Sequence, residues 1–287
     1  MSETWTVLRL LTWCRDYFAD KNIDSPRLDA ELLLAHVLGC DRVGLYLRYD
    51  QPLQPDELAQ FRELVRRRAA REPVAHLLGT KEFYGLSFLT DRRALVPRPE
   101  TEILVDAVLA ALPADQPQRL CEIGIGSGCL AIALLTKRPE WTIAATDTSA
   151  DALNLAGENA TRHGVSERLE LREVDLIADD AGLFDAVVSN PPYVPAADCE
   201  TTMPEVARFD PRSALDGGAD GLDIVRRLIA RSPDHLHPGG LLALEIGIDQ
   251  AAAVKALLTD DGRYEQIEIS RDLAGIERVV LARTKES

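Results

Sequence analysis

The feature that most constrains the fold is an alternation of short apolar runs with helical patterns, which fills the chain from Arg119 onward. Strands that alternate with helices in this way predict a doubly wound α/β fold with a mostly parallel sheet. No helical pattern separates the last two runs, so we expect these to form an antiparallel pair. The seven expected strands are Arg119–Ile123, Thr142–Thr146, Leu169–Val174, Ala186–Ser189, Leu241–Glu245, Tyr264–Ile269 and Arg278–Ala282.

The N-terminal segment has a different pattern, which predicts a small bundle of roughly three to five helices. Apolar residues recur at helical spacing from about Trp5 to Ala19 and again after Pro55, and Ser25 followed by Pro26 predicts the start of a helix with a serine N-cap. From Phe83 the stretch FYGLSFLTDRRALVP alternates and predicts a short β-hairpin. We therefore expect a helical bundle over residues 1–76, a hairpin linker over 77–95 and an α/β domain over 96–287.

Charge and composition argue against several classes of function. The net charge of −15, from 32 basic and 47 acidic residues, argues against nucleic acid as the main partner, and the basic run Arg66–Arg68 is expected to be a solvated helix face. The five cysteines are scattered without a C-x-x-C pair, so we expect a reducing compartment and no metal site. No apolar run approaches the ~18 residues of a membrane span and the N-terminus lacks a secretory signal, so we expect a cytoplasmic protein without membrane contact.

A glycine-rich turn follows the first expected strand. The sequence EIGIGSG, Glu122–Gly128, stands between a strand and a helix, at the edge of the sheet where ligands bind in doubly wound folds. Glycines there let the backbone approach a ligand closely. The spacing is G-x-G-x-G, which differs from the dinucleotide fingerprint G-x-G-x-x-G, and tight packing alone can also require such a turn.

Acidic residues end the next two strands. Asp147 stands about twenty residues beyond the glycines, where a carboxylate can accept hydrogen bonds from ribose hydroxyls. Asp175 follows the third strand. Together with Glu122 these acids favour a cationic nucleoside over a pyrophosphate, and the phosphate-binding motif G-x-x-x-x-G-K-[S/T] is absent from the sequence. S-adenosylmethionine, a sulfonium, is therefore the expected cofactor.

The stretch SNPPYVP, Ser189–Pro195, follows the fourth strand, and its two adjacent prolines keep the chain rigid and extended. The Asn190 side-chain oxygen and the Pro191 carbonyl are two acceptors that can hold both hydrogens of a planar amino group and aim its lone pair at a methyl group. Tyr193 offers a ring on which a flat group can stack. Taken alone, the stretch is equally typical of a rigid turn with a half-buried tyrosine, but its position after the glycine turn and two acids favours the catalytic interpretation.

Together these motifs resemble the amino-methylating S-adenosylmethionine methyltransferases and, more narrowly, the HemK/PrmC family. The resemblance implies a Rossmann-like class I methyltransferase fold. It also implies direct in-line methyl transfer to the side-chain nitrogen (N5) of the glutamine in the Gly-Gly-Gln motif of class-1 peptide-chain release factors. Asn-Pro-Pro-Tyr alone is shared with DNA and RNA adenine methyltransferases. The segments that carry the resemblance, over nearly the whole chain, are Glu72–Leu86, Leu95–Glu102, Glu122–Gly128, Ser189–Pro195 and Glu205–Leu228.

The resemblance further implies roles for most of the site residues, while Asp175 and the charge of Glu122 rest on the argument from the acids above. Catalysis is expected of Asn190, Pro191 and Tyr193, and glutamine binding of these three together with Pro192. Three positions depart from the family pattern: Glu122 stands where Asp is usual, Ile125 where Thr is usual, and Leu176, expected to cover the adenine, where many members have an aromatic residue. The expected cofactor-binding residues are Glu122, Gly124, Ile125, Gly126, Ser127, Gly128, Asp147, Asp175, Leu176 and Asn190.

Two other interpretations stay open from the sequence. A nucleic-acid adenine N6-methyltransferase needs a recognition surface and a pocket for a flipped base, and the acidic charge and the compact helical bundle argue against it. A non-catalytic adaptor with a methyltransferase fold would be expected to lose Asn190 or the glycines, and both remain. We expect a monomer that takes release factors as its protein substrate and recognises them through the N-terminal bundle.

Overall fold

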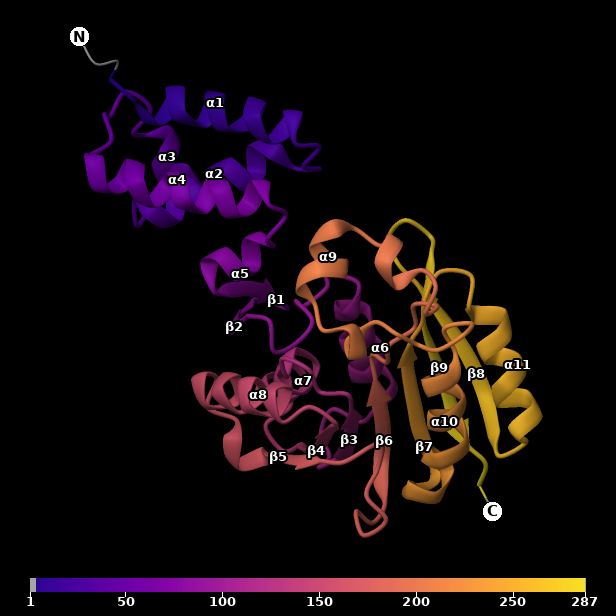
Figure 1. The fold of residues 1–287 in the computed structure, drawn as a ribbon. Coiled ribbons are helices and arrows are strands. Elements are labelled where there is room, and N and C mark those ends of the chain that lie inside the picture. Colours follow the sequence, from indigo (N-terminus) through magenta and orange to yellow (C-terminus); the bar gives the residue numbers. More distant parts are fainter. Residues whose placement is uncertain (1–3, 287) are drawn as a thin grey trace. The chain divides into compact units, whose positions relative to one another are not determined.

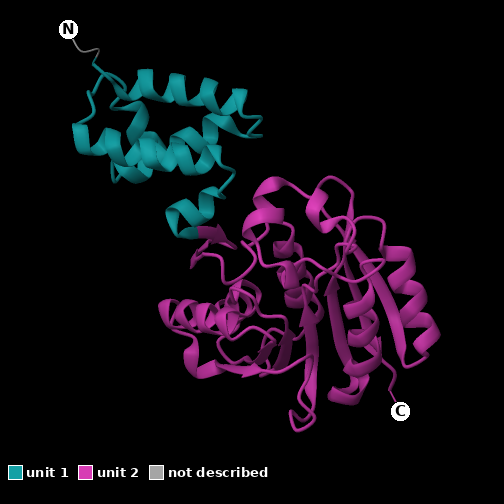
Figure 2. Cartoon of the chain, viewed as in Figure 1, with its two compact units in different colours: residues 1–80 teal, residues 81–287 magenta. Residues whose placement is uncertain are grey.

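The chain divides into two compact units, residues 1–80 and residues 81–287 (Figure 2). The computed structural model describes residues 4–286. The boundary between the units lies inside the segment 77–95, where the sequence predicts a hairpin. Among the described residues, no helix is both long and apolar enough to cross a bilayer.

The described part of the first unit is a bundle of five helices around its own apolar core (Figure 1). Large buried side chains of this core include Phe18, Leu33 and Phe61. Pro26 begins the second helix as expected, but the Ser25 side chain forms no capping hydrogen bond, since its backbone (ψ 57°) is not extended as a cap requires. The helices are α1 (Val7–Asp20), α2 (Pro26–Val37), α3 (Arg42–Tyr46), α4 (Pro55–Ala69) and α5 (Val74–Leu78).

The basic run on α4 differs from the expectation. Arg66 pairs with Glu63 and Arg67 with Glu72, each at 2.6 Å. Arg68 is buried and donates to Asp29 of α2 at 2.7 Å, so the prediction of a solvated face is wrong for this residue. The physical reason is that α4 packs against α2 along this side. Because each guanidinium has a carboxylate partner, the run presents little net positive charge.

A seven-stranded sheet forms the centre of the described second unit, in the order β5-β4-β3-β6-β7-β9-β8 (Figure 1). Strand β9 runs antiparallel to both of its neighbours, whereas the other neighbouring strands pair in parallel. The predicted doubly wound sheet, with its antiparallel pair at one end, is confirmed. The strands are β3 (Arg119–Ile123), β4 (Thr142–Asp147), β5 (Leu169–Glu173), β6 (Phe184–Ser189), β7 (Leu236–Glu245), β8 (Tyr264–Arg271) and β9 (Glu277–Thr284).

Helices cover both faces of this sheet, because successive strand residues point to opposite faces and both sets are apolar. Helices α6 (Thr101–Ala111), α7 (Cys129–Lys137) and α8 (Ala150–Arg162) contribute to a core with Leu120 of β3 and Ala186 of β6. Helices α10 (Asp223–Arg231) and α11 (Ala251–Asp261) contribute to the core of the opposite face, with Cys121 and Val187 of the same two strands. A short helix, α9 (Pro204–Phe209), lies in the connection between β6 and α10.

The hairpin of β1 (Thr80–Phe83) and β2 (Leu86–Leu89) is part of the packing of the second unit. Phe83 and Phe88 are 1% and 0% exposed and lie in the core that α6, α7 and α8 share. Asn159 of α8 holds the hairpin by hydrogen bonds to both backbone groups of Leu89, at 2.7 and 3.1 Å. Removal of the hairpin would therefore expose the core beneath it.

Candidate active site

The carboxyl ends of β3, β4 and β6 lie side by side at the point where the strand order reverses. Ile123 at the end of β3 pairs with Thr146 of β4 and with Ser189 of β6. The next residue of each strand is therefore presented at the same level of this edge, where doubly wound sheets bind their ligands. These three residues are Gly124, Asp147 and Asn190.

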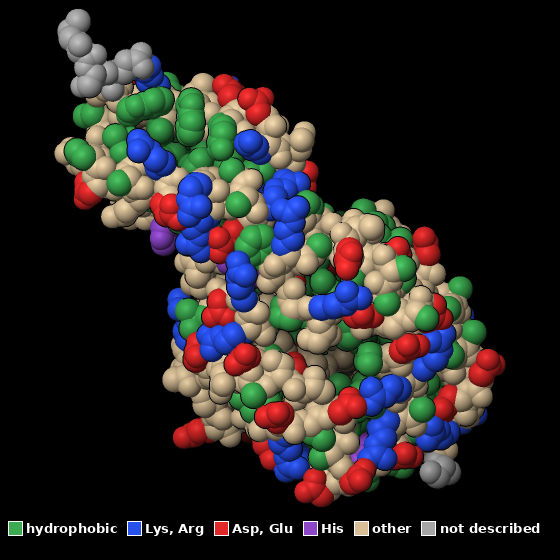
Figure 3. Space-filling view, in the orientation of Figure 1, with side chains coloured by type: hydrophobic (Ala, Val, Ile, Leu, Met, Phe, Trp, Pro, Cys, Tyr) green, Lys and Arg blue, Asp and Glu red, His purple; other side chains and the backbone are tan. Residues whose placement is uncertain are grey.

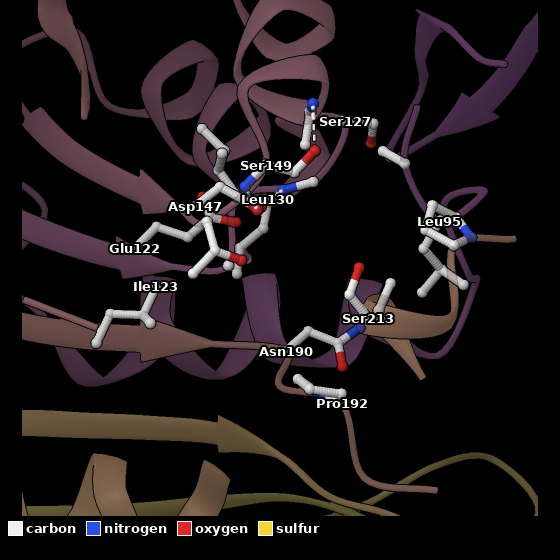
Figure 4. A pocket seen from close by; sticks show the side chains of 18 of the residues that line it. Leu95, Glu122, Ile123, Ser127, Leu130, Asp147, Ser149, Asn190, Pro192 and Ser213 are labelled. Atoms are coloured by element: carbon white, nitrogen blue, oxygen red, sulfur yellow. Dashed lines mark hydrogen bonds between the residues drawn. The ribbon is translucent and has the colours of Figure 1, made fainter. Parts of the chain in front are cut away.

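A pocket opens at this edge, and most of the predicted site residues line it. Figure 4 shows Glu122 and Asp147 on one side of the pocket and Asn190 with Pro192 on another. Gly128, Pro191 and Tyr193 are not among the residues that line it. The predicted residues that do line it are Glu122, Gly124, Ile125, Gly126, Ser127, Asp147, Asp175, Leu176, Asn190 and Pro192.

The G-x-G-x-G spacing corresponds to three left-handed backbone positions. Gly124, Gly126 and Gly128 have φ values of +74°, +54° and +81°. A Cβ on Gly128 would lie 3.0 Å from the side chain of Ile132, so at this position glycine also serves the packing of α7. Ile125 is 3% exposed and joins the core, which gives an apolar residue a reason to stand at this position.

Asp147 holds the glycine turn and also faces the pocket. Its two carboxylate oxygens accept hydrogen bonds from the backbone N–H groups of Gly126, at 3.1 Å, and Ser149, at 2.9 Å. Each oxygen keeps a further lone pair. Asp147 can thus orient the turn and accept hydrogen bonds from a ligand at the same time.

Glu122 is a buried carboxyl group, and one of its two oxygens lacks a hydrogen-bond partner among the described residues. The side chain is 3% exposed, and the oxygen without a partner is Oε2. Burial raises the pKa of Glu122 well above its usual range, with Asp147 adding to the effect and the Ala131 N–H opposing it. An unsatisfied buried oxygen beside a pocket favours a ligand that carries a hydrogen-bond donor or a positive charge.

The two predicted residues after β5 contribute differently. The Asp175 carboxylate is exposed and pairs with Arg227 of α10, so its charge is already partly neutralised. Leu176 has a positive φ of 58°, and its carbonyl accepts a hydrogen bond from the Thr146 hydroxyl at 2.7 Å. This bond holds Leu176 at the pocket as an apolar surface.

The Asn-Pro-Pro-Tyr stretch is fixed by partners outside the predicted set. The Asn190 amide nitrogen donates to the Thr101 hydroxyl at 3.0 Å. The Tyr193 hydroxyl donates to Glu245 at the end of β7, at 3.3 Å. Burial raises the pKa of Tyr193, with Glu245 adding to the effect, so its phenol stays neutral and is not poised to act as a base. Pro191 is the buried residue of the stretch, whereas Asn190, Pro192 and Tyr193 are partly exposed.

The segment Asp216–Gly218 packs directly against the Asn-Pro-Pro-Tyr stretch. The Gly217 N–H donates to the Val194 carbonyl at 2.8 Å, and the Val194 N–H donates to the Leu215 carbonyl at 2.9 Å. A Cβ on Gly217 would lie 2.7 Å from the Pro192 carbonyl oxygen, and one on Gly221 would lie 2.3 Å from that of Tyr193. Glycines are needed at both positions because two backbones approach closely there.

Sequence reasoning missed several residues that line the pocket. Residues 93–98 and Pro211, Ser213 and Ala214 line it as well. These two segments are joined by Arg98, which donates to Asp210 at 2.6 Å. The available signal was that both segments carry the family resemblance, although neither contains a recognisable ligand-binding pattern. Thr101 also lines the pocket and lies in the segment Leu95–Glu102 that carries the resemblance, but a single threonine gives no sign of its role. Glu245, which does not line the pocket, left no signal, because a strand-ending glutamate is common.

Comparison with known proteins identifies the family. Residues 9–79 match the PrmC N-terminal domain family and residues 100–207 match the methyltransferase small domain family. The chain is 44% identical over 281 residues to the release factor glutamine methyltransferase of Geobacter sulfurreducens, over 97% of this chain and 96% of that protein. It is 43% identical over 274 residues to the protein of the same name from Deinococcus radiodurans, over 96% and 97% of the two chains.

Solved structures agree at the level of the fold. A methyltransferase from Pyrococcus furiosus, 19% identical, superposes with a TM-score of 0.53 over 79% of this chain and 98% of that one. The hMettl16 catalytic domain, in complex with an RNA hairpin, is 18% identical and superposes with a TM-score of 0.60 over 78% and 82% of the two chains. These likenesses support the class I methyltransferase fold, and the near full-length relatives narrow the assignment: the chain belongs to the release factor glutamine methyltransferase family.

Proposed function

We propose that this protein transfers a methyl group from S-adenosylmethionine to the side-chain nitrogen, N5, of the glutamine in the Gly-Gly-Gln motif of class-1 release factors. The observation that carries the proposal is the alignment of Gly124, Asp147 and Asn190 at one edge of the sheet, in a chain of this family. The first two suit a cofactor and the third suits an amide acceptor. All three line one pocket, so cofactor and acceptor would meet there.

The pocket suits S-adenosylmethionine. The partnerless oxygen of Glu122 would be satisfied by a donor on the ligand, and Asp147 keeps lone pairs for ribose hydroxyls. Leu176 offers an apolar surface to the adenine. When bound, S-adenosylmethionine supplies a methyl group made electrophilic by a positively charged sulfur.

Asn190 and Pro191 would prepare the acceptor nitrogen. A glutamine amide is planar and its nitrogen lone pair is delocalised, so it is a weak nucleophile. The side-chain oxygen of Asn190 and the carbonyl of Pro191 would hold its two hydrogens and favour a pyramidal nitrogen in line with the methyl group. The prepared nitrogen would take the methyl group with its lone pair, the electron pair of the broken carbon–sulfur bond would stay on sulfur, and one N–H proton would then leave to solvent.

The first unit is proposed to recognise the release factor. All residues that line the pocket lie in the second unit, which leaves substrate recognition as the role we propose for the bundle. Leu8 and Trp13 of α1 are each 46% exposed, and the rings of Trp13 and Tyr17 stack with their centroids 5.2 Å apart. Figure 3 shows hydrophobic side chains gathered on one face of the first unit. Exposed apolar surface of this kind is typical of protein contacts. A cytoplasmic monomer without a nucleic-acid substrate completes the proposal.

Replacement of Asp147 by alanine should weaken S-adenosylmethionine binding by about 1–3 kcal/mol, since ribose hydroxyls lose a charged acceptor and the Gly126 N–H loses its partner. Isothermal titration calorimetry measures this effect. Asp151→Ala, an exposed aspartate in the first turn of α8, is the matched control and should leave the affinity unchanged. Unchanged affinity in Asp147→Ala would remove Asp147 from the cofactor site.

Incubation with methyl-labelled S-adenosylmethionine tests the acceptor, with a purified release factor and duplex DNA offered separately. We expect label in the release factor and none in the DNA at ordinary salt, because the net charge of −15 repels a polyanion. Label in DNA alone would favour the adenine N6-methyltransferase. Cofactor binding without transfer to either acceptor would favour a non-catalytic adaptor.

A further inference from the structure

Behind the Asn-Pro-Pro-Tyr stretch lies a buried carboxyl group that the mechanism above does not use. Glu245 is 1% exposed and ends β7, one strand away from Asn190. It accepts a hydrogen bond from Tyr193 at 3.3 Å. The Thr101 hydroxyl also lowers the pKa of Glu245, as a donor to its carboxylate would. Thr101, 2% exposed, in turn accepts a hydrogen bond from the Asn190 amide nitrogen at 3.0 Å.

The direction of these hydrogen bonds decides which atom Asn190 presents to the pocket. A threonine hydroxyl has one proton to donate, and an ionised carboxylate can only accept. When Glu245 is ionised, it can accept a hydrogen bond from the Thr101 hydroxyl. The Thr101 oxygen is then left to accept a hydrogen bond from the amide nitrogen of Asn190. The other amide atom, the oxygen, is then free for a substrate N–H.

Protonation of Glu245 allows the opposite direction. A neutral carboxyl group can donate to the Thr101 oxygen, and the Thr101 proton can then turn to the oxygen of Asn190. The amide would flip and present its NH2 group to the pocket. Two NH2 groups facing each other cannot form the hydrogen bonds that prepare the acceptor nitrogen.

We propose that Glu245 is a positioning residue that acts through Thr101 to keep the side-chain oxygen of Asn190 facing the substrate. The inference rests on the proposed function and adds a condition to it: turnover requires the ionised form of a residue that touches neither substrate nor cofactor. The Oε2 atom of Glu245 has no hydrogen-bond partner among the described residues, which makes this ionised form costly to bury.

The groups around Glu245 make it responsive to pH. Burial raises the pKa of Glu245 to about 7, where Glu100 adds to the rise and the Thr101 and Tyr193 hydroxyls and Arg278 oppose it. Burial raises the pKa of the Cys129 thiol to about 12, and the charge of Glu245 adds to this rise. The pKa of Tyr193 is raised as well, so both groups stay neutral near pH 7. Among the other carboxyls of the site, Glu122 and Asp210 also have a raised pKa, so a Glu245 variant must identify the titrating group.

The test measures kcat for release-factor methylation from about pH 6 to about pH 8.5. In the wild type kcat should fall about tenfold per pH unit below about pH 7. Glu245→Gln cannot ionise, and its amide NH2 can donate to Thr101 as the neutral carboxyl does, so its profile should be flat, with kcat at pH 8 at least about tenfold below the wild type. Its melting temperature at pH 8 should not fall, because a carboxyl whose pKa is raised in the folded state loses stability as pH rises through that pKa.

Threonine variants test the relay itself. Thr101→Val breaks the relay, so it should lower kcat at pH 8 about tenfold, the effect of one lost hydrogen bond, and remove the acidic limb, with KM for S-adenosylmethionine unchanged. Thr101→Ser should restore it. Thr284→Val is the matched control, since it removes a buried hydroxyl that donates to the His237 carbonyl outside the pocket, and it should leave kcat unchanged.

A second measurement does not depend on the release factor. The side-chain 15N–1H signals of Asn190, assigned by their loss in Asn190→Ala, should shift with a midpoint near pH 7 in the wild type and stay fixed in Glu245→Gln. An acidic limb that persists in Glu245→Gln, or Asn190 signals that ignore pH in the wild type, would overturn the proposal. If the wild type transfers no methyl group while these signals titrate, the positioning network stands and the proposed function fails.

Discussion

Replacement of Asn190 by alanine is expected to lower the turnover of release-factor methylation by about 10²–10³, the usual cost of one preorganised hydrogen-bonding group at a reacting centre. The variant loses the side-chain acceptor that would hold one hydrogen of the substrate amide. S-adenosylmethionine affinity should change far less, because the glycine turn and Asp147 come from β3 and β4. Single-turnover methyl transfer and calorimetry measure the two quantities separately.

The control for this variant is Asn154→Ala, which removes an exposed amide on α8 and should behave as the wild type. The combination that contradicts the account is near wild-type turnover in Asn190→Ala together with a large loss of cofactor affinity. Asn190 would then serve the cofactor alone, and the acceptor would be held by other groups.

A chain that begins at Lys81 is expected to bind S-adenosylmethionine and to fail to methylate an intact release factor. It keeps the complete second unit, including Phe83 and Phe88 of the hairpin. A chain that begins at residue 96 would lose these two buried aromatic side chains, each a cost of about 3–5 kcal/mol when removed, and is expected to be unstable. Calorimetry with S-adenosylmethionine, a thermal melt and the labelled transfer assay measure the three properties.

A short peptide that contains Gly-Gly-Gln separates recognition from chemistry in this experiment. The truncated and full chains should methylate the peptide at similar rates, since both contain the pocket. Failure of the truncated chain on the peptide as well would indicate a catalytic defect. Full activity on the intact release factor would show that the first unit is dispensable, and the role proposed for it would be wrong.

The sheet was predictable because its strands differ sharply from their surroundings in the sequence. All seven expected strands are present, and β3 has the predicted bounds, Arg119–Ile123. The largest difference is β7, which begins at Leu236 and not at Leu241. Pro238, Gly239 and Gly240 argue against a strand by propensity, but pairing of Phe184 with Leu236, with a register shift between Phe184 and Ala186, extends the strand through them.

The pocket was predictable where a residue follows directly from a strand end, as Gly124, Asp147 and Asn190 do. The remainder depends on segments brought together by tertiary packing. Arg98 and Asp210 stand 112 residues apart in sequence and meet beside the pocket. Thr101 meets Asn190 across 89 residues, a pairing that no local pattern encodes.

The most direct test of the central claim is peptide mass mapping of a release factor after incubation with this protein and S-adenosylmethionine. The account predicts one added methyl group on the peptide that contains Gly-Gly-Gln, with fragment ions that place it on the glutamine side-chain nitrogen. The Asn190→Ala reaction, sampled over the same time, should leave that peptide unmodified. A methyl group on another residue, or an unmodified glutamine in a reaction where duplex DNA carries methyladenine, would contradict the account.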